Sequence, residues 1–300
     1  MDKLTGGEYG FLLLTSNLGN PERNPLTVAQ MRDLFVRSEQ MKRSDISRDI
    51  DVYDFVSIGY SPKTAQHMIN LLHDEVLLQY YLNKARKADC VPITRATANY
   101  PVVLRKRLAL DSPGCLWAKG DVSLLDTPMV SLVGSRDLNP ENEKFAEEVG
   151  RQAALQGYTL ISGNARGADK TAQNACLAAG GSVISVVADS LETHRSRDRV
   201  LYLSESSFDE PFSSQRALSR NRVIHALGLK TFVAQSSLKT GGTWDGTVKN
   251  LRSGWSDVYA FRDGSEAMLL LEQLGANLID LRDLKSIYDL QNNEVNLFDR

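Results

Sequence analysis

The hydrophobic positions follow one pattern in the first third of the chain and another in the rest. Up to about residue 110, apolar residues recur at helical spacing, as Val28, Met31 and Leu34 do. From about residue 121, short continuous apolar runs alternate with helical segments. We therefore expect a helical domain over residues 1–110, an α/β domain over residues 111–285 and a C-terminal tail over residues 286–300.

The helical part is predicted to contain helices over residues 6–18, 28–41 and 74–88, followed by a short strand in CVPITR. The segment VSIGYSPKTAQHMINLL adds a glycine turn at Gly59, an N-cap at Ser61 and a proline at the first helical position. This segment resembles a helix-hairpin-helix unit, which binds backbone phosphates. Plain packing of two helices is the simpler interpretation.

The second part carries apolar runs in which we expect strands, at residues 129–133, 158–161, 182–188, 231–234 and 257–261. Helices are expected from Pro140, capped by Asn139, to a stop at Gly157, and over residues 168–179, 219–227 and 246–251. Such alternation is typical of a parallel sheet covered by helices on both faces. The sequence therefore predicts an α/β fold, a Rossmann-like parallel sheet domain preceded by a small helical domain.

Composition narrows the class of protein. The 300 residues include 42% hydrophobic residues, as in an ordinary globular protein, and three cysteines with no CxxC spacing. We expect neither a disulfide framework nor a metal site, and a reducing, cytoplasmic location. The apolar run near the N-terminus is too short for a membrane span and does not resemble a signal peptide, so no membrane association is expected.

The net charge of −2 hides an uneven distribution. Residues 213–256 contain seven Lys or Arg and one acidic residue, whereas residues 257–300 contain nine acidic and four basic residues. The basic block also carries glycines and asparagines, which suit contact with an anion.

Three loops that follow predicted strands combine glycines, hydroxyls and a basic residue. Ligands of parallel sheets bind beyond the carboxyl ends of the strands. Glycine lets backbone amides approach an anion, helix N-termini favour negative charge, and Arg adds forked hydrogen bonds. These loops are GSR at residues 134–136, SGNARGAD at residues 162–169 and KTGGT at residues 239–243. We expect an anion-binding site where they converge.

Several enzyme classes lack their sequence signatures here. GxGxxG and GxxxxGK[ST] are both absent, which disfavours a dinucleotide-dependent dehydrogenase and a P-loop ATPase, and we expect no cofactor. His194 and His225 are interpreted as surface or packing residues because no nucleophile accompanies them. Asp169 is expected to pair with Arg136 or Arg166 and hold its loop, rather than to transfer protons.

Four ordered motifs resemble the DprA/Smf family of DNA-processing proteins. They are VSLVGSR, ISGNARGADKTAQNACLAAGGSVISVVA, SRNRVIHALG and SLKTGGTWDGTVKN. The likeness spans residues 91–261. The sequence departs from the family pattern at Asn164, which replaces an apolar residue, at Gln173, where His is frequent, and at Gln235, where Glu is common.

The resemblance implies a non-enzymatic, homodimeric protein that binds single-stranded DNA, protects it, and helps to load a RecA-type recombinase during DNA-mediated transformation and recombination. It also implies which residues would contact DNA. These are Gly134, Ser135, Arg136, Ser162, Gly163, Asn164, Arg166, Gly167, Asp169, Arg220, Asn221, Arg222, Lys239, Thr240 and Gly241. A cationic groove of this kind suits binding that is independent of DNA sequence.

Two alternatives stay open. The wider fold family includes phosphoribohydrolases with a GGxGTxxE loop, but KTGGTWDGTVKN lacks the glutamate that this pattern needs. A nucleotide-sensing domain of the same fold is the other alternative. The tail segment EVNLF, residues 294–298, loosely resembles peptides that dock on a sliding clamp, although a chance match or a packed terminal strand explains it more simply.

Overall fold

The computed structural model describes residues 4–41, 48–205 and 207–290. The chain divides into two compact units, one made of Met1–Ala118 with Glu205–Glu210 and the other of Lys119–Ser204 with Pro211–Arg300. The EVNLF segment lies outside the described residues. Every helix within the described ranges is too short or too polar to span a lipid bilayer.

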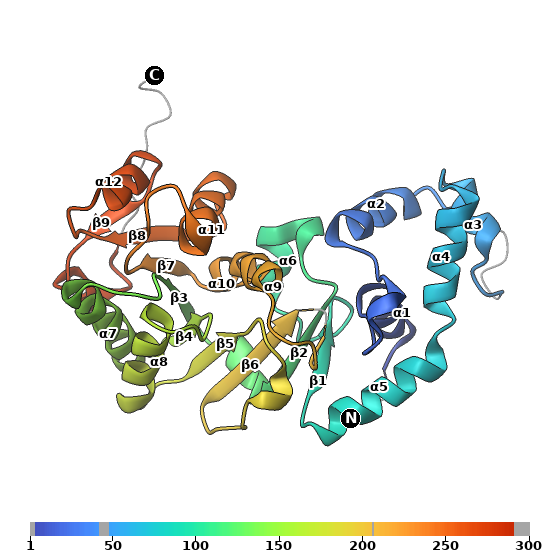
Figure 1. Cartoon of the computed structure of the whole chain (residues 1–300), viewed down its shortest axis with the longest axis horizontal. Helices are drawn as coiled ribbons and strands as arrows, with labels where there is room; N and C mark the ends of the chain where they lie inside the picture. The colour runs from blue at the N-terminus through green and yellow to red at the C-terminus, as the bar shows by residue number, and fades with distance from the viewer. Residues whose placement is uncertain (1–3, 42–47, 206, 291–300) are drawn as a thin grey trace. The chain divides into compact units, whose positions relative to one another are not determined.

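The first unit is helical up to its first strand (Figure 1, blue to cyan). Its helices are α1 (Gly6–Thr15), the 3-10 helix η1 (Pro21–Arg23), α2 (Val28–Ser38), α3 (Val52–Ser57), α4 (Pro62–Leu72) and α5 (Glu75–Lys87). α1 ends before the predicted Leu18 because Ser16 adopts an extended conformation and its hydroxyl accepts a hydrogen bond from the backbone of Leu18 (3.3 Å).

The predicted helix pair around Gly59 is present as α3 and α4. Gly59 has φ +92°, and the Ser61 hydroxyl accepts a hydrogen bond from the Thr64 amide at the start of α4 (3.1 Å). Met68 on α4 is buried in the apolar core of the first unit, and Arg37 donates to the Gly59 carbonyl (2.9 Å). These contacts give the hairpin a structural role, and phosphate binding by it stays a prediction.

Two strands follow, and the first unit ends within the second of them, at Ala118. β1 (Val91–Thr94) pairs antiparallel with β2 (Cys115–Gly120), and α6 (Val102–Leu108) and the 3-10 helix η2 (Ala109–Asp111) lie between them in sequence. Tyr81, Trp117 and Phe208 form a buried aromatic cluster with ring centroids 4.7 to 5.3 Å apart. Asp209 anchors this cluster, because it accepts from the Tyr81 hydroxyl (2.5 Å) and pairs with Lys84 (2.6 Å).

The second unit is built on a parallel sheet, which confirms the predicted Rossmann-like α/β fold. Its strands are β3 (Met129–Val133), β4 (Thr159–Ser162), β5 (Val183–Val186), β6 (Val200–Glu205), β7 (Lys230–Val233), β8 (Asp257–Phe261) and β9 (Asn277–Ile279). Its α-helices are α7 (Pro140–Leu155), α8 (Ala168–Ala178), α9 (Ser214–Ser219), α10 (Asn221–Leu227), α11 (Gly241–Ser253) and α12 (Glu266–Gln273). The 3-10 helices are η3 (Val122–Asp126), η4 (Leu191–Thr193) and η5 (Asp283–Ser286).

Several predicted elements of this unit differ from the structure. β6 and β9 are missing from the prediction, because β9 has only three residues and β6 directly follows a charged segment. α11 begins at Gly241, five residues before its predicted start, since the glycine pair there has the composition of a loop. The helix expected over residues 219–227 is α10, which begins at Asn221, whereas α9, which meets it at Arg220, was not predicted.

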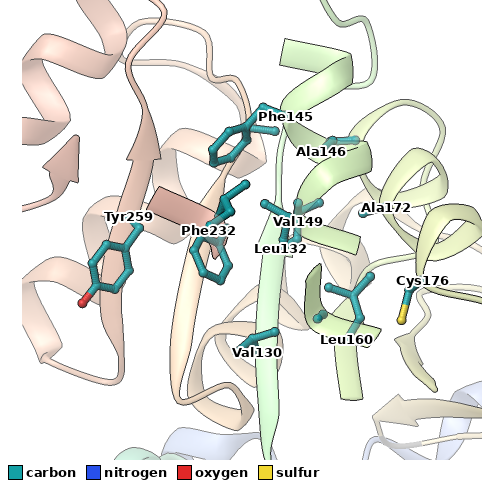
Figure 2. Close-up of a cluster of buried hydrophobic side chains, with 14 of the residues drawn as sticks. Val130, Leu132, Phe145, Ala146, Val149, Leu160, Ala172, Cys176, Phe232 and Tyr259 are labelled. Carbon is teal, nitrogen blue, oxygen red and sulfur yellow. The ribbon is translucent and has the colours of Figure 1, made fainter. Parts of the chain in front are cut away.

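Alternate residues of the central strand β3 face opposite sides of the sheet. Val130 and Leu132 pack in the core that α7 and α8 cover, together with Phe145 and Phe232 (Figure 2). Between them, the Ser131 hydroxyl donates to the Ile224 carbonyl of α10 (2.5 Å). Helices therefore cover both faces of the sheet, with α7 and α8 on one side and α10 on the other.

The strand order β6-β5-β4-β3-β7-β8-β9 places a topological switch point between β3 and β7. From β3 the chain proceeds outward through β4, β5 and β6, and it then returns to form β7 on the other side of β3. Connections from two such neighbours leave in opposite directions, so their loops border a crevice in which ligands of α/β proteins bind.

Gln235 joins the two loops at the switch point. Its side-chain oxygen accepts from the Asn139 amide (2.8 Å), its side-chain nitrogen donates to the Asp137 carbonyl (3.3 Å), and its carbonyl accepts from the Ser135 amide (2.9 Å). Asn139 occupies the N-cap position of α7, as predicted, but its side chain makes no capping hydrogen bond to the helix. Its backbone instead serves this loop-to-loop connection.

Candidate nucleic-acid interface

Two clefts open at the predicted edge of the sheet in the second unit. The first cleft, of about 400 Å³, is bordered by the loop after β3, the start of α8, the helices α9 and α10, and the loop into α11. The second cleft, of about 300 Å³, is bordered by the loops after β3, β4 and β5 and by the segment before α9. We keep the names first cleft and second cleft for these two sites.

Most of the predicted site residues line one of these clefts. Gly134, Ser135, Arg136, Asp169, Arg220, Asn221, Thr240 and Gly241 line the first cleft. Arg136, Gly163, Asn164, Arg166 and Arg220 line the second cleft. Arg136 and Arg220 contribute to both, so the two clefts share a cationic wall.

The two shared arginines differ in exposure. Arg136 follows β3 and is exposed, whereas Arg220 lies at the junction of α9 and α10 and is 8% exposed. Arg220 donates from Nη1 to the Val186 carbonyl at the end of β5, and its Nε has no hydrogen-bond partner among the described residues. A buried cation with incomplete hydrogen bonding favours an anionic neighbour.

Arg220 lies against the backbone of the loop after β4. A Cβ atom on residue 163 would stand 1.9 Å from Nη1 of Arg220, so only glycine fits at Gly163. Burial lowers the pKa of Arg220, and attraction to Asp169 and Asp189 counteracts that effect. Because an arginine stays protonated at any physiological pH, the wall remains cationic.

Asp169 holds the loop after β4 through the backbone. Its carboxylate is buried and accepts from the Ala165 amide (3.1 Å). Burial raises the pKa of this carboxyl group, and the charge of Arg220 and the backbone hydrogen bonds oppose the rise. Arg166, one of its two predicted partners, instead pairs with Asp137 (2.7 Å). Asp169 therefore holds its loop, as expected, but it does so by accepting hydrogen bonds from backbone amides and not by an ion pair with Arg166.

Asn164 and Gly167 give the loop its shape. Asn164 has φ +60°, in the left-handed region that asparagine tolerates better than apolar residues, and its side-chain oxygen accepts from Lys170. Gly167 has φ +80°, and a Cβ atom there would stand 2.4 Å from the Arg136 carbonyl oxygen. The Ala168 amide donates to the Ser135 carbonyl (3.1 Å), which joins this loop to the loop after β3.

Four predicted site residues line neither cleft. Ser162 is buried, and its hydroxyl accepts from Gln173 (2.6 Å), which also donates to Ser185 (3.0 Å). Gly167 packs beneath the loops, and Arg222 is half-buried and engaged in other contacts. Lys239 has φ +54° and is exposed beside the lining residue Thr240.

Sequence reasoning missed residues at each of the two clefts. Asp189 and Phe212 line the second cleft, and Leu218 and Ile224 line the first. Asp189 directly follows a predicted strand, so its position was a usable signal. The sequence pattern did not indicate that Phe212 lies at the site, because its position depends on β6 and on the start of α9, and neither was predicted.

The two histidines near the basic block differ in environment. His225 is fully buried, accepts from Asn250 at Nδ1 (3.2 Å), and burial lowers its pKa to about 3, so it is a neutral packing residue at pH 7. His194 contacts Asp189 through Nε2 (3.1 Å) and stacks on Tyr202. Within the described ranges, no three His, Cys, Asp or Glu side chains form a cluster that could hold a metal ion.

The fold and the clefts define an α/β protein with a cationic, glycine-lined ligand site at its switch point. Residues 92–262 match the sequence model of a family described as DNA recombination-mediator protein A. Because the match covers more than half of the chain, the protein belongs to this family, and the resemblance noted from the four motifs is confirmed.

Curated relatives carry the same family names. The chain is 30% identical over 182 residues to DNA processing protein DprA of Streptococcus pneumoniae, covering 56% of this chain and 64% of that protein. It is 30% identical over 142 residues to protein Smf of Escherichia coli, covering 44% of this chain and 38% of that protein. The chain thus matches less than two thirds of the length of these relatives.

Solved structures share the fold. The X-ray structure of DprA from Streptococcus pneumoniae superposes with a TM-score of 0.72 at 24% identity, covering 96% of this chain and all of that chain. A structure of DprA from Helicobacter pylori, described for its single-stranded DNA binding mode, superposes with a TM-score of 0.55 at 23% identity, covering 65% of this chain and 94% of that one.

Proposed function

We propose that this protein binds single-stranded DNA along the two clefts and acts in DNA processing and recombination. The observation that carries the proposal is the cationic wall formed by Arg136 and Arg220, which both clefts share. Arginine forms forked hydrogen bonds with phosphate oxygens, and glycine-lined loops let backbone amides approach the same anions. Two neighbouring clefts with one cationic wall suit successive groups along a nucleic-acid strand.

The family membership supports a recombination-mediator role. The relatives are described as DNA processing proteins, and the Helicobacter pylori relative is described as binding single-stranded DNA. We propose that this protein likewise protects single-stranded DNA and loads a RecA-type recombinase, as a cytoplasmic homodimer without enzymatic activity. The phosphoribohydrolase alternative lacks its glutamate, and Asp169, the buried carboxylate of the first cleft, holds backbone amides.

Fluorescence anisotropy with labelled oligo-dT tests DNA binding. The logarithm of the binding constant is expected to fall linearly with the logarithm of the salt concentration, by about 0.7 for each phosphate that is neutralised. A parallel assay follows hydrolysis of nucleoside monophosphates. Salt-dependent DNA binding without turnover supports the proposal. Turnover would select the hydrolase alternative, and a binding constant that barely changes with salt would reject the cationic groove.

A further inference from the structure

The second cleft contains groups that a phosphate site does not require. Phe212 lines it with 55% of its surface exposed, although a phenyl ring gains nothing from a phosphate. Asp189 lines it with a carboxylate that is 41% exposed, although a carboxylate repels phosphate. The cationic wall of Arg136 and Arg220 stands beside both. This mixture suits a ligand with a flat apolar face, polar edges and a phosphate attached.

The structure fixes the segment that carries Phe212. Arg216 on α9 donates from Nη1 to the Pro211 carbonyl (2.9 Å) and to the Ala188 carbonyl (3.0 Å). Ala188 directly precedes Asp189 and also lines the second cleft. One guanidinium group therefore holds both the backbone beside Phe212 and the backbone beside Asp189, so the two lining residues are fixed relative to each other.

Asp189 is held as a hydrogen-bond acceptor. His194 contacts Asp189 Oδ1 through Nε2 (3.1 Å), and because an ionised carboxylate only accepts, Nε2 is assigned as the donor. Partial burial raises the pKa of Asp189, but the hydrogen bond and the charge of His194 outweigh it, and the net pKa is lowered. Arg216, Arg220 and Lys170 add positive charge around it.

We propose that the second cleft is a nucleobase subsite in which Phe212 stacks on one base of the bound strand and Asp189 accepts a hydrogen bond from its exocyclic amino group. The inference rests on the proposed binding of single-stranded DNA and adds a base preference to it. Cytosine, adenine and guanine carry such an amino group, whereas thymine presents carbonyl oxygens around a single ring N–H. A carboxylate therefore favours the first three bases over thymine.

Competition between oligo-dC and oligo-dT of equal length, at neutral pH and fixed salt, tests this preference. Both are flexible pyrimidine strands with the same phosphates, so their affinity ratio isolates the contact to the base. We expect the wild-type protein to bind oligo-dC at least about fivefold more tightly, the lower end of the discrimination that one good base contact gives.

The variant Asp189→Asn removes the negative charge while keeping the size of the side chain. The charge change raises affinity for both oligonucleotides alike, but the preference for oligo-dC is expected to fall to about onefold. Glu272→Gln is the control, because Glu272 is an exposed acid on α12 that lines neither cleft. It makes the same charge change and is expected to keep the wild-type ratio.

Phe212→Ala tests the stacking contact and is expected to weaken binding of both oligonucleotides about fivefold or more, with Phe212→Tyr close to wild type. A wild-type ratio near one, a ratio unchanged in Asp189→Asn, or full affinity in Phe212→Ala would overturn the base subsite while DNA binding itself stands. Failure of the wild-type protein to bind either oligonucleotide would overturn the proposed function, and this inference with it.

Discussion

The guanidinium group of Arg220 rests on the backbone of Gly163, where a Cβ atom would stand 1.9 Å from Nη1 and 2.4 Å from Cζ. Two loops far apart in sequence thus depend on each other. Arg220 reaches its buried position between the clefts only because residue 163 has no side chain, and the loop after β4 is covered by the arginine in return.

Gly163→Ala is expected to displace Arg220 and to weaken binding to single-stranded DNA. The guanidinium group is buried and bonded to the Val186 carbonyl, so it cannot simply swing into solvent. Overpacking of this kind lowers the free energy of unfolding by about 1–3 kcal/mol. Chemical denaturation and oligo-dT anisotropy measure the two effects.

Gly10→Ala is the matched control for that substitution. Gly10 lies inside α1 without a positive φ, and within the described part of the chain a Cβ atom there would meet open space. Alanine is preferred to glycine in a helix interior by about 1 kcal/mol, so this variant is expected to be slightly more stable and to bind DNA normally. Equal behaviour of the two variants would contradict the role given to Gly163.

Arg136→Ala is expected to weaken binding to oligonucleotides of every sequence and to reduce the salt dependence. An exposed arginine that neutralises one phosphate contributes about 0.7 to the slope on a single strand. Lys239→Ala is expected to act in the same direction, because Lys239 is an exposed cation beside the lining residue Thr240. Arg151→Ala, on the exposed face of α7 beside Glu148, serves as a control because Arg151 lines neither DNA cleft. An unchanged slope in folded Arg136→Ala protein would remove Arg136 from the interface.

The backbone at Asn164 predicts different outcomes for two substitutions. Both Asn164→Gly and Asn164→Ala lose the contact with Lys170, so their difference isolates the cost of the left-handed conformation at φ +60°. Glycine adopts this conformation freely, whereas for alanine it costs about 1–2 kcal/mol. We expect the alanine variant to be less stable by that amount in denaturant titrations, and equal stability would show that the loop relaxes.

Buried His225 predicts a loss of stability in acid. Its folded-state pKa of about 3 lies below the ordinary value of 6.5, so the unfolded chain takes up a proton at higher pH than the folded protein does. Stability therefore falls as the pH drops from 6.5 towards 3, by about 1.4 kcal/mol for each pH unit from this group. Denaturation of His225→Asn, which keeps an acceptor for Asn250, is expected to give a flatter pH profile. Identical slopes for the two proteins would contradict this assignment.

Much of the site was predictable because it follows from sheet geometry. Loops after parallel strands share one edge, so the residues after β3 and β4 and before α11 were expected to converge, and Arg136, Gly163 and Thr240 do line the clefts. The motif around Arg220 was expected at the site from the family resemblance. Its burial against Gly163 was not, because burial depends on how α9 and α10 meet.

Other features depend on elements that the hydrophobic pattern does not reveal. Phe212 reaches the second cleft only because β6 lies beside β5 and α9 begins at Ser214. The structure also explains two residues at which the sequence departs from the family pattern. Asn164 adopts a left-handed conformation, and Gln173 donates to hydroxyls on two neighbouring strands, a role that needs an amide nitrogen or another donor.

Gln235 fixes the width of the crevice at the switch point. Its backbone and side chain tie the loop after β7 to the loop after β3, whose strands lie side by side in the sheet. The spacing of the anion-binding groups is then set by the protein, and the ligand has to conform to it. A flexible single strand can bend so that its phosphates match this fixed spacing, whereas a stiff duplex resists bending over the same few nucleotides. We therefore expect selectivity for single strands to arise from the rigidity of the protein at this crevice.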